Sequence, residues 1–463
     1  MLPAFLVTSL LAPLAAEPRA AEAVTRLAVS PTAAAKPAFK YQLLPEVREL
    51  KAGNPVQWYI RCFMEQRIFF FNKDVIAERA RYRTMPLKEL PADKLKNYGG
   101  NALSQADWAA RLDTPDWQVL DRVQTEGTGI AFPELAPFRE LANGLQVRFR
   151  GDVARREFDD AIGTAKTMFA FARHLGEHPT VAANALGLVV ADMALDSLEE
   201  MIQQPGCPNL YWALTDLPRP LVELRKGFQG ARALVDTELR TLRDDASMTD
   251  AELDELIGHL SGQAGFAREQ VGQPPRNLRT KFTASARDAE SVRAARARLV
   301  EAGYAESRVA KFPALQVVLL DEKREYEIRR DEEMKLLSLT PPEIEALAGP
   351  EGEAKAGTDA LFADLLPPIR ETRLAQARLQ QRVALLRHVE ALRMYAATHA
   401  GELPQKLTDV GVPLPGDLFT SKPFSYKLDG TTAHLQATVA KGEEKNAKFT
   451  LNYEITIRRK TEK

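Results

Sequence analysis

Cysteine and histidine are scarce in this chain, which contains two cysteines and six histidines among 463 residues. The cysteines, Cys62 and Cys207, stand at no diagnostic spacing from histidine, so no Cys/His metal or nucleophile motif is recognisable. Cys62 lies in the apolar run 58–64, where a buried free thiol is expected. In an exported protein the two cysteines could instead form one disulfide, and this alternative stays open.

An excess of charge of one sign is also missing. The chain has 62 Lys and Arg against 63 Asp and Glu, so no overall field draws it to nucleic acid or to an anionic membrane. One local excess of basic residues runs through 276–298. It lacks stacking aromatic residues and a groove-reading motif, so we interpret it as a solvated helix face and expect no nucleic-acid partner.

Recognisable catalytic motifs are lacking as well. The sequence has no G-x-S-x-G and no Gly-rich phosphate loop, and its many carboxylates are scattered rather than paired in a pattern. The absence of a catalytic constellation favours a protein that is not an enzyme, although it leaves an enzyme as the alternative.

Long hydrophobic runs are limited to the first residues, MLPAFLVTSLLAPLAA, which have the length of the apolar region of a signal peptide. We therefore predict a signal peptide or N-terminal anchor over 1–23, and an exported protein of the periplasm or cell envelope. No later apolar stretch is expected to cross a bilayer. Residues 24–40 are rich in Ala and Pro and aperiodic, which is typical of a linker.

Residues 41–348 carry a mainly helical pattern. One helix has an apolar stripe at three- and four-residue steps, formed by Phe158, Ile162, Ala165, Phe169 and Ala172. A neighbouring face of the same helix is apolar too and carries Met168, Phe171 and Leu175. Such a helix is expected to lie between two layers. Further helices follow in series, and Thr249 and Glu252 stand in capping-box spacing at the start of one. The predicted fold class is mainly α, with a body of layered, repeat-like α-hairpins.

Residues 349–359, GPEGEAKAGTD, have the composition of a linker, and a small α+β head is predicted over 360–463. A long helix is expected from Pro368 to about Ala400. Three stretches then alternate apolar and polar residues and predict strands: 424–428, 435–439 and 449–457. Asp429-Gly430 is typical of a tight hairpin between the first two. An antiparallel three-stranded meander with one apolar face needs a cover, which the long helix can provide.

Two resemblances concern the helical body. Residues 156–162, REFDDAI, are similar to the second helix of a tetratricopeptide-like (TPR-like) hairpin. At three places, 173–180, 209–214 and 217–220, the chain also resembles a family of uncharacterised exported proteins of planctomycete bacteria. This second resemblance implies export and brings no assigned activity.

A third resemblance concerns the predicted head. The long helix, the GELP stretch at 401–404 and the KPFSY stretch at 422–426 resemble the soluble head of type II secretion pseudopilins. The resemblance implies a pilin-like α+β head, and it makes an accessory component of a secretion or pilus-like system one alternative function.

The stretch ARHLGEHP at 172–179 contains H-x-x-E-H, the zinc-binding pattern of one class of metallopeptidases. In that interpretation His174 and His178 bind zinc and Glu177 activates its water, with Glu199 or Glu200 as the third ligand. Both rings must then lie on one helix face. A residue before proline is driven out of the α region, so Pro179 predicts that the helix ends at His178 and that the two rings diverge.

Two other histidines are weaker candidates for a metal site. His388 and His399 are eleven residues apart on one face of the long helix, and we interpret both as surface residues. Tyr211 and Trp212 are expected to be core or hairpin anchors and are the candidates for contact with a partner.

The function predicted from these patterns is an exported helical scaffold or binding protein of unknown ligand, without a cofactor, whose partner is a protein or a cell-envelope component. A zinc-dependent hydrolase that uses the H-x-x-E-H stretch is the alternative that needs a cofactor.

Overall fold

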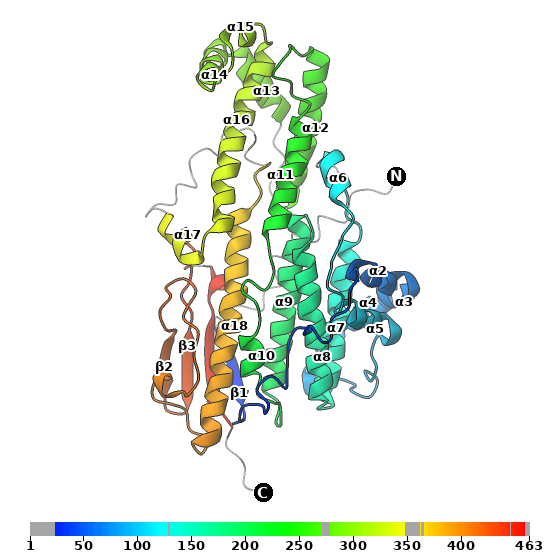
Figure 1. Cartoon of the computed structure of the whole chain (residues 1–463), viewed down its shortest axis with the longest axis vertical. Coiled ribbons are helices and arrows are strands. Elements are labelled where there is room, and N and C mark those ends of the chain that lie inside the picture. Colours follow the sequence, from blue (N-terminus) through cyan, green and yellow to red (C-terminus); the bar gives the residue numbers. More distant parts are fainter. Residues whose placement is uncertain are drawn as a thin grey trace.

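The computed structural model describes residues 24–127, 130–270, 278–347, 362, 365–444 and 446–458. It confirms a mainly α fold with a small α+β part. The molecule is elongated, with helices along most of its length and one sheet at the lower end (Figure 1). The predicted signal segment 1–23 and the predicted linker 349–359 lie outside the described residues.

Short helices form the outer layer of the lower part (Figure 1). Asn54 and Asn72 begin two of them, because their side chains accept hydrogen bonds from the first free backbone N–H groups of α2 and α4. The elements of this layer are α2 (Pro55–Glu65), α3 (Arg67–Phe71), α4 (Lys73–Thr84), η2 (Leu87–Glu89) and α5 (Gly100–Ala109). Helix α6 (Leu120–Thr125) follows them in the chain and lies higher in the molecule (Figure 1).

Three long helices form the centre of the lower part: α7 (Leu135–Ala154), α8 (Phe158–Gly176) and α9 (Val181–Ile202). They pack against one another, and α8 is buried on two faces, as the apolar pattern predicts. By length and composition α9 could cross a membrane, with a mean hydropathy of 1.5, and the expectation that no later stretch crosses a bilayer stays a prediction. Because 72% of that window is buried between neighbouring helices, packing inside the protein explains its apolar composition.

A second group of helices builds the narrow upper end (Figure 1). It has its own hydrophobic core, which runs from Val235 to Tyr326 and includes Phe362. The capping box predicted for α12 is present, since Thr249 and Glu252 exchange side-chain-to-backbone hydrogen bonds. The elements here are α11 (Arg225–Leu239), α12 (Asp250–Gln270), α13 (Leu278–Arg287), α14 (Ala289–Glu301), α15 (Glu306–Val309) and α16 (Ala314–Met334). The chain then continues through η4 (Lys335–Ser338) to α17 (Pro341–Leu347), which lies at the middle height of the molecule (Figure 1).

The predicted long helix and three-stranded meander are present, and the second strand begins three residues before the predicted stretch 435–439. Helix α18 (Ile369–Thr398) covers three antiparallel strands, β2 (Ser425–Asp429), β3 (Thr432–Gln436) and β4 (Asn452–Ile457), with short 3₁₀ turns η7 (Leu407–Asp409) and η8 (Ala447–Phe449) before and between them. Gly430 makes the tight turn between β2 and β3 with φ of 58°, a left-handed conformation that favours glycine.

The sheet has a fourth strand, which corrects the linker prediction for 24–40. Strand β1 (Thr25–Val29) pairs in parallel with β4, so that Leu27 lies beside Ile455, and the strand order is β1-β4-β3-β2. Leu27 and Val29 are buried in the core. The segment is therefore a structural element rather than a spacer between domains.

The hydrophobic cores do not follow the predicted boundary between a body at 41–348 and a head at 360–463. Residues of α18 and of all four strands belong to the same core as α7, α8 and α9, with short α10 (Tyr211–Thr215) packed between them and α18. The upper helices, by contrast, have the separate core. The α+β part is thus built into the lower half of the molecule.

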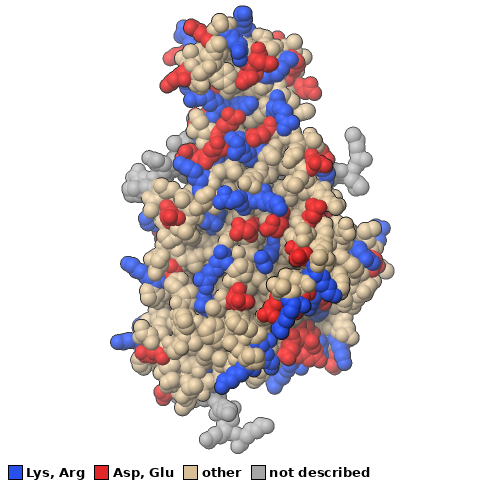
Figure 2. Space-filling model, viewed as in Figure 1, with Lys and Arg blue, Asp and Glu red and all other residues tan. Residues whose placement is uncertain are grey.

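Charged side chains of both signs are interspersed over the visible face of the molecule (Figure 2). In the basic segment 276–298, Arg279 pairs with Asp254 at 3.5 Å and Arg298 pairs with Asp321 at 2.6 Å. Part of the local basic excess is therefore balanced by acidic residues of neighbouring helices.

Candidate functional site

The H-x-x-E-H stretch lies at the C-terminal end of α8. The helix ends at Gly176, and the backbone N–H of His178 bonds to the carbonyl of Leu175 at 3.1 Å in the turn that follows. The helix was predicted to end at His178 before Pro179, and it ends two residues earlier.

The three side chains of the motif face different partners. Nδ1 of His174 lies 3.0 Å from the hydroxyl of Tyr59, while Nδ1 of His178 lies 2.9 Å from the hydroxyl of Thr180. Glu177 is exposed and pairs with Lys226 at 3.3 Å. Within the described ranges, no group of three or more His, Cys, Asp or Glu side chains is arranged to hold a metal ion.

The acidic residues proposed as a third ligand are also engaged elsewhere. Glu199 accepts a hydrogen bond from Arg382 at 2.8 Å, and both carboxylate oxygens of Glu200 accept from Arg150 at 2.7 Å. These arginines lie on α18 and α7, so both carboxylates tie α9 to its neighbours.

His178 is buried and packs edge-on between the rings of Trp117 and Phe132, at 4.8 and 5.3 Å, while His174 is half-buried. Burial lowers the pKa of each imidazole from 6.5 to about 3. Both rings are therefore neutral at physiological pH, with their Nδ1 atoms in hydrogen bonds.

We expect stability to fall as the pH drops below about 6.5, because these histidines take up protons when the chain unfolds. Above pH 6.5 both states are neutral, and between 6.5 and about 3 only the unfolded state binds the proton. Each histidine then costs about 1.4 kcal/mol per pH unit. Urea unfolding at pH 7.5 and at pH 5 measures this change. Between the two pH values, the free energy of unfolding of His178→Phe should fall by about 2 kcal/mol less than that of wild type.

The control for this measurement is His399→Gln, since His399 is exposed as predicted. An equal pH dependence in wild type and His178→Phe would contradict the expectation.

His388 was also predicted at the surface, and this prediction is wrong. It is buried against Phe424, its Nδ1 lies 2.8 Å from the carbonyl of Ala384, and burial lowers its pKa to about 4.

Tyr211 and Trp212 differ in exposure. Tyr211 is 0% exposed, and its hydroxyl donates to the carbonyl of Pro413, so it is a core anchor and cannot meet a partner at the surface. Trp212 packs edge-on against Tyr211 with ring centroids 5.0 Å apart and is partly exposed. Of the two interaction candidates, only Trp212 reaches solvent.

Both cysteines are buried free thiols, so the structure does not contain the disulfide. Burial raises the pKa of Cys62 and of Cys207 to about 12. Neither thiol is a thiolate at neutral pH, which makes both poor nucleophiles and poor metal ligands.

Comparison of the chain with protein-family models, curated proteins and solved structures gave no match. The resemblances to TPR-like hairpins, planctomycete proteins and pseudopilins therefore stay predictions.

A cluster of buried and half-buried charges joins α18, α9 and the sheet. Arg382 donates to Asp192 at 2.5 Å, to Asp196 at 2.7 Å and to Glu199 at 2.8 Å, and Glu199 also accepts from the hydroxyl of Tyr453 in β4. The three acidic residues are spaced four and three apart, so they lie on one face of α9. The cluster fixes α9 relative to the α+β part. The spacing of these three acidic residues is a signal that the sequence alone contains.

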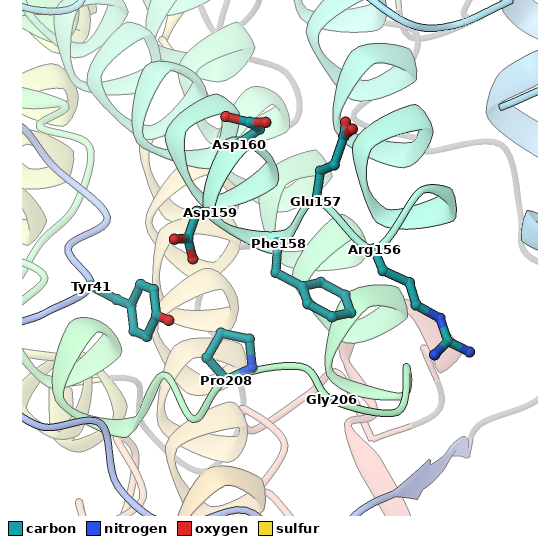
Figure 3. Close-up of a pocket in the computed structure, with 8 residues that line it drawn as sticks. All are labelled: Tyr41, Arg156, Glu157, Phe158, Asp159, Asp160, Gly206 and Pro208. Atoms are coloured by element: carbon teal, nitrogen blue, oxygen red, sulfur yellow. The ribbon is translucent and has the colours of Figure 1, made fainter. Parts of the chain in front are cut away.

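An open groove lies at the start of α8, and we call it the Tyr41 groove. It has a volume of about 420 Å³ and is lined by Tyr41, Arg156, Glu157, Phe158, Asp159, Asp160, Gly206 and Pro208. Figure 3 shows the rings of Tyr41, Phe158 and Pro208 around it, with the Asp159 carboxylate above Tyr41. Sequence patterns did not identify this groove, because its residues come from three distant segments.

Arg156 in this groove has a strained backbone. It follows α7 with φ of 63°, its N–H bonds to the carbonyl of Val153, and the N–H of Glu157 bonds to the carbonyl of Asp152, both at 2.9 Å. This is the Schellman arrangement, which favours glycine at the position of Arg156. A residue with a side chain is less stable there by roughly 1 kcal/mol.

Proposed function

We propose that this protein is an exported binding scaffold rather than an enzyme, and that the Tyr41 groove receives a segment of a partner protein or of a cell-envelope component. The observation that carries the proposal is this open groove, in which aromatic faces and charged side chains lie together. Arg156, Asp159 and Asp160 are exposed there. Such a mixture suits a polar peptide segment, because the rings supply contact area while the charges select the partner.

The strained conformation of Arg156 supports a role in binding, since strained backbone positions cluster at functional sites. We expect Arg156→Gly to raise the free energy of unfolding by about 1 kcal/mol and to weaken partner binding. Ala400 is the matched control. It occupies the same position after α18, with φ of 53°, so Ala400→Gly should gain similar stability without a change in binding.

Partner capture can be tested with a photo-crosslinking residue placed at Asp160 and, as a control, at the exposed Glu402 in the turn after α18. We expect envelope fractions to give one defined crosslinked product from position 160 and none from position 402. The yield from 160 should fall at least about tenfold when Arg156→Gly is added. Equal products from both positions, or stable turnover of a small molecule by the purified protein, would rule the proposal out.

The zinc-hydrolase alternative has less support. His174 and His178 are hydrogen-bonded to the hydroxyls of Tyr59 and Thr180, and Glu177 faces a lysine rather than the histidines. No observation favours it over binding. The pilus alternative is consistent with the meander and its covering helix, which a pseudopilin head also has. In this protein, however, Arg382 and Arg393 of that helix bind carboxylates inside the molecule.

A further inference from the structure

A second cavity lies between α18, the chain around Leu217–Leu221 and the chain around Pro415–Leu418. We call it the Arg387 pocket. It is a small cavity of about 100 Å³. Its walls are mainly aliphatic and include Leu217, Leu221, Leu379, Val383 and Leu418, and the guanidinium of Arg387 also borders it.

Arg387 is a buried cation without an anionic partner among the described residues. Its side chain is 4% exposed, its Nε is buried without a hydrogen-bond partner, and its guanidinium lies over the ring of Tyr211 at 5.6 Å. Within the part of the chain that the structure describes, no carboxylate lies within 4.0 Å of it. A buried charge in this state is costly unless something pairs with it.

Two other arginines of α18 show how this protein treats buried charge. Arg382 contacts three carboxylates, and Arg393 contacts the carboxylate of Glu390 at 2.8 Å. Each lies at a level of burial similar to that of Arg387. Arg387 therefore departs from a pattern that the same helix otherwise follows.

The two charged residues that line the pocket are both arginines. Arg219 lines it as well, and burial together with the charge of Arg219 lowers the pKa of Arg387. Asp417, which stands between the lining residues Gly416 and Leu418, accepts hydrogen bonds from Gln381 and from the backbone of Phe419, so its carboxylate is already used. The pocket thus combines an apolar wall with an uncompensated positive potential.

We propose that the Arg387 pocket binds a carboxylate carried on a short aliphatic group. Arg387 donates its guanidinium hydrogens to the two carboxylate oxygens, and the aliphatic group fills the space along Leu379, Val383 and Leu418. A monoanion fits better than phosphate, because a single buried guanidinium supplies the donors. The pocket is well below the roughly 300–1,000 Å³ of sites for drug-sized ligands, so it takes one aliphatic residue or a short acid.

Two sources carry this chemistry: the C-terminal aliphatic residue of a peptide chain, and a free short-chain carboxylic acid. The test is calorimetric titration of the full chain with 4-methylpentanoate and with a short peptide ending in leucine, each beside its amide. We expect at least one carboxylate to bind and its amide to bind at least about tenfold more weakly, because the amide cannot form the charged pair. Tighter binding of the peptide identifies a chain end, and tighter binding of the free acid identifies a small ligand. Failure of both carboxylates to bind overturns the proposal.

The variant that tests Arg387 is Arg387→Met, with Arg378→Met as the control, since Arg378 lies on the same helix beside Asp192 and outside the pocket. Arg387→Met should lose binding at least about tenfold and, without ligand, melt a few degrees higher, because an unpaired buried charge is replaced by an apolar chain of similar length. Arg378→Met should keep the affinity. Leu418→Trp, which fills the pocket from its other side, should abolish binding with Arg387 intact. Binding within twofold of wild type in either pocket variant would overturn the proposal.

This proposal does not depend on the Tyr41 groove. Arg156→Gly leaves the Arg387 pocket unchanged and should keep the affinity for 4-methylpentanoate. Loss of crosslinking at position 160 without loss of carboxylate binding would therefore separate the two sites.

Discussion

Replacing Arg393 by methionine is expected to lower the free energy of unfolding by about 3–5 kcal/mol. Arg393 and Glu390 form an ion pair in which both side chains are 0% exposed. The guanidinium also donates to the carbonyls of Ser30 at 3.1 Å and Cys207 at 2.9 Å. The variant leaves the carboxylate of Glu390 buried with only the backbone N–H of Leu210 as partner, at 3.2 Å. Urea unfolding at neutral pH measures the loss.

The control is the double variant Arg393→Met, Glu390→Met. Removal of both charges by apolar side chains of similar size should restore most of the stability, because the large penalty comes from the charge that is left alone. Arg387→Met on the same helix should change stability in the opposite direction. A loss of less than about 1 kcal/mol in the single variant would show that water or a rearranged side chain satisfies Glu390.

The second large effect concerns the segment that has the composition of a linker. A chain that begins at residue 33 lacks β1 and with it the buried side chains of Leu27 and Val29. Each buried aliphatic side chain contributes roughly 2–5 kcal/mol, so we expect this chain to lose at least about 4 kcal/mol or its cooperative unfolding. The truncation also removes the hydroxyl of Thr32, which accepts from Arg393 at 2.8 Å. Thermal unfolding followed by circular dichroism measures the change.

A chain that begins at residue 24 keeps β1 and serves as the reference. Leu27→Ala in that chain should cost about 2–5 kcal/mol through the cavity that it leaves. If the shorter chain unfolded like the reference, β1 would not contribute to the folded state in solution, and the linker interpretation would stand.

The sequence allowed α18, β2, β3 and β4 to be predicted because their signals are local. The turn at Asp429-Gly430, the alternation in β4 and the proline before α18 each act on residues within a few positions of themselves. The end of α8 before Pro179 has the same character. Rules of short range are sufficient for such elements.

Strand β1 could not be predicted by such rules. Its five residues include only two buried apolar side chains, and its partner strand lies at the other end of the sequence. The buried arginines of α18 were missed for a related reason. Charged residues on a helix are usually exposed, and only the packing of α9 and the sheet around α18 makes Arg382, Arg387 and Arg393 interior residues.

The candidate sites depend even more on tertiary structure. The Tyr41 groove collects residues from the segments at 41, 156–160 and 206–208, and the Arg387 pocket collects three others. The motif that stood out in the sequence, H-x-x-E-H, is instead placed at a helix end with its rings in separate hydrogen bonds. The spacing of residues in the sequence reveals a site only when these residues lie on one continuous helix or strand. The residues of the two candidate sites come from separate segments.

The parallel pairing of β1 with β4 also constrains the order in which this protein folds. Arg26 and Glu454, which pair across the two strands, are separated by 428 residues. At a synthesis rate of roughly 5–20 residues per second, β1 leaves the ribosome about 20–90 s before its partner. During that interval Leu27 and Val29 have no sheet to join and are available to a chaperone. Strand β1 can therefore pair with β4 only after β4 has been synthesised, and this insertion closes the core as a late step of folding.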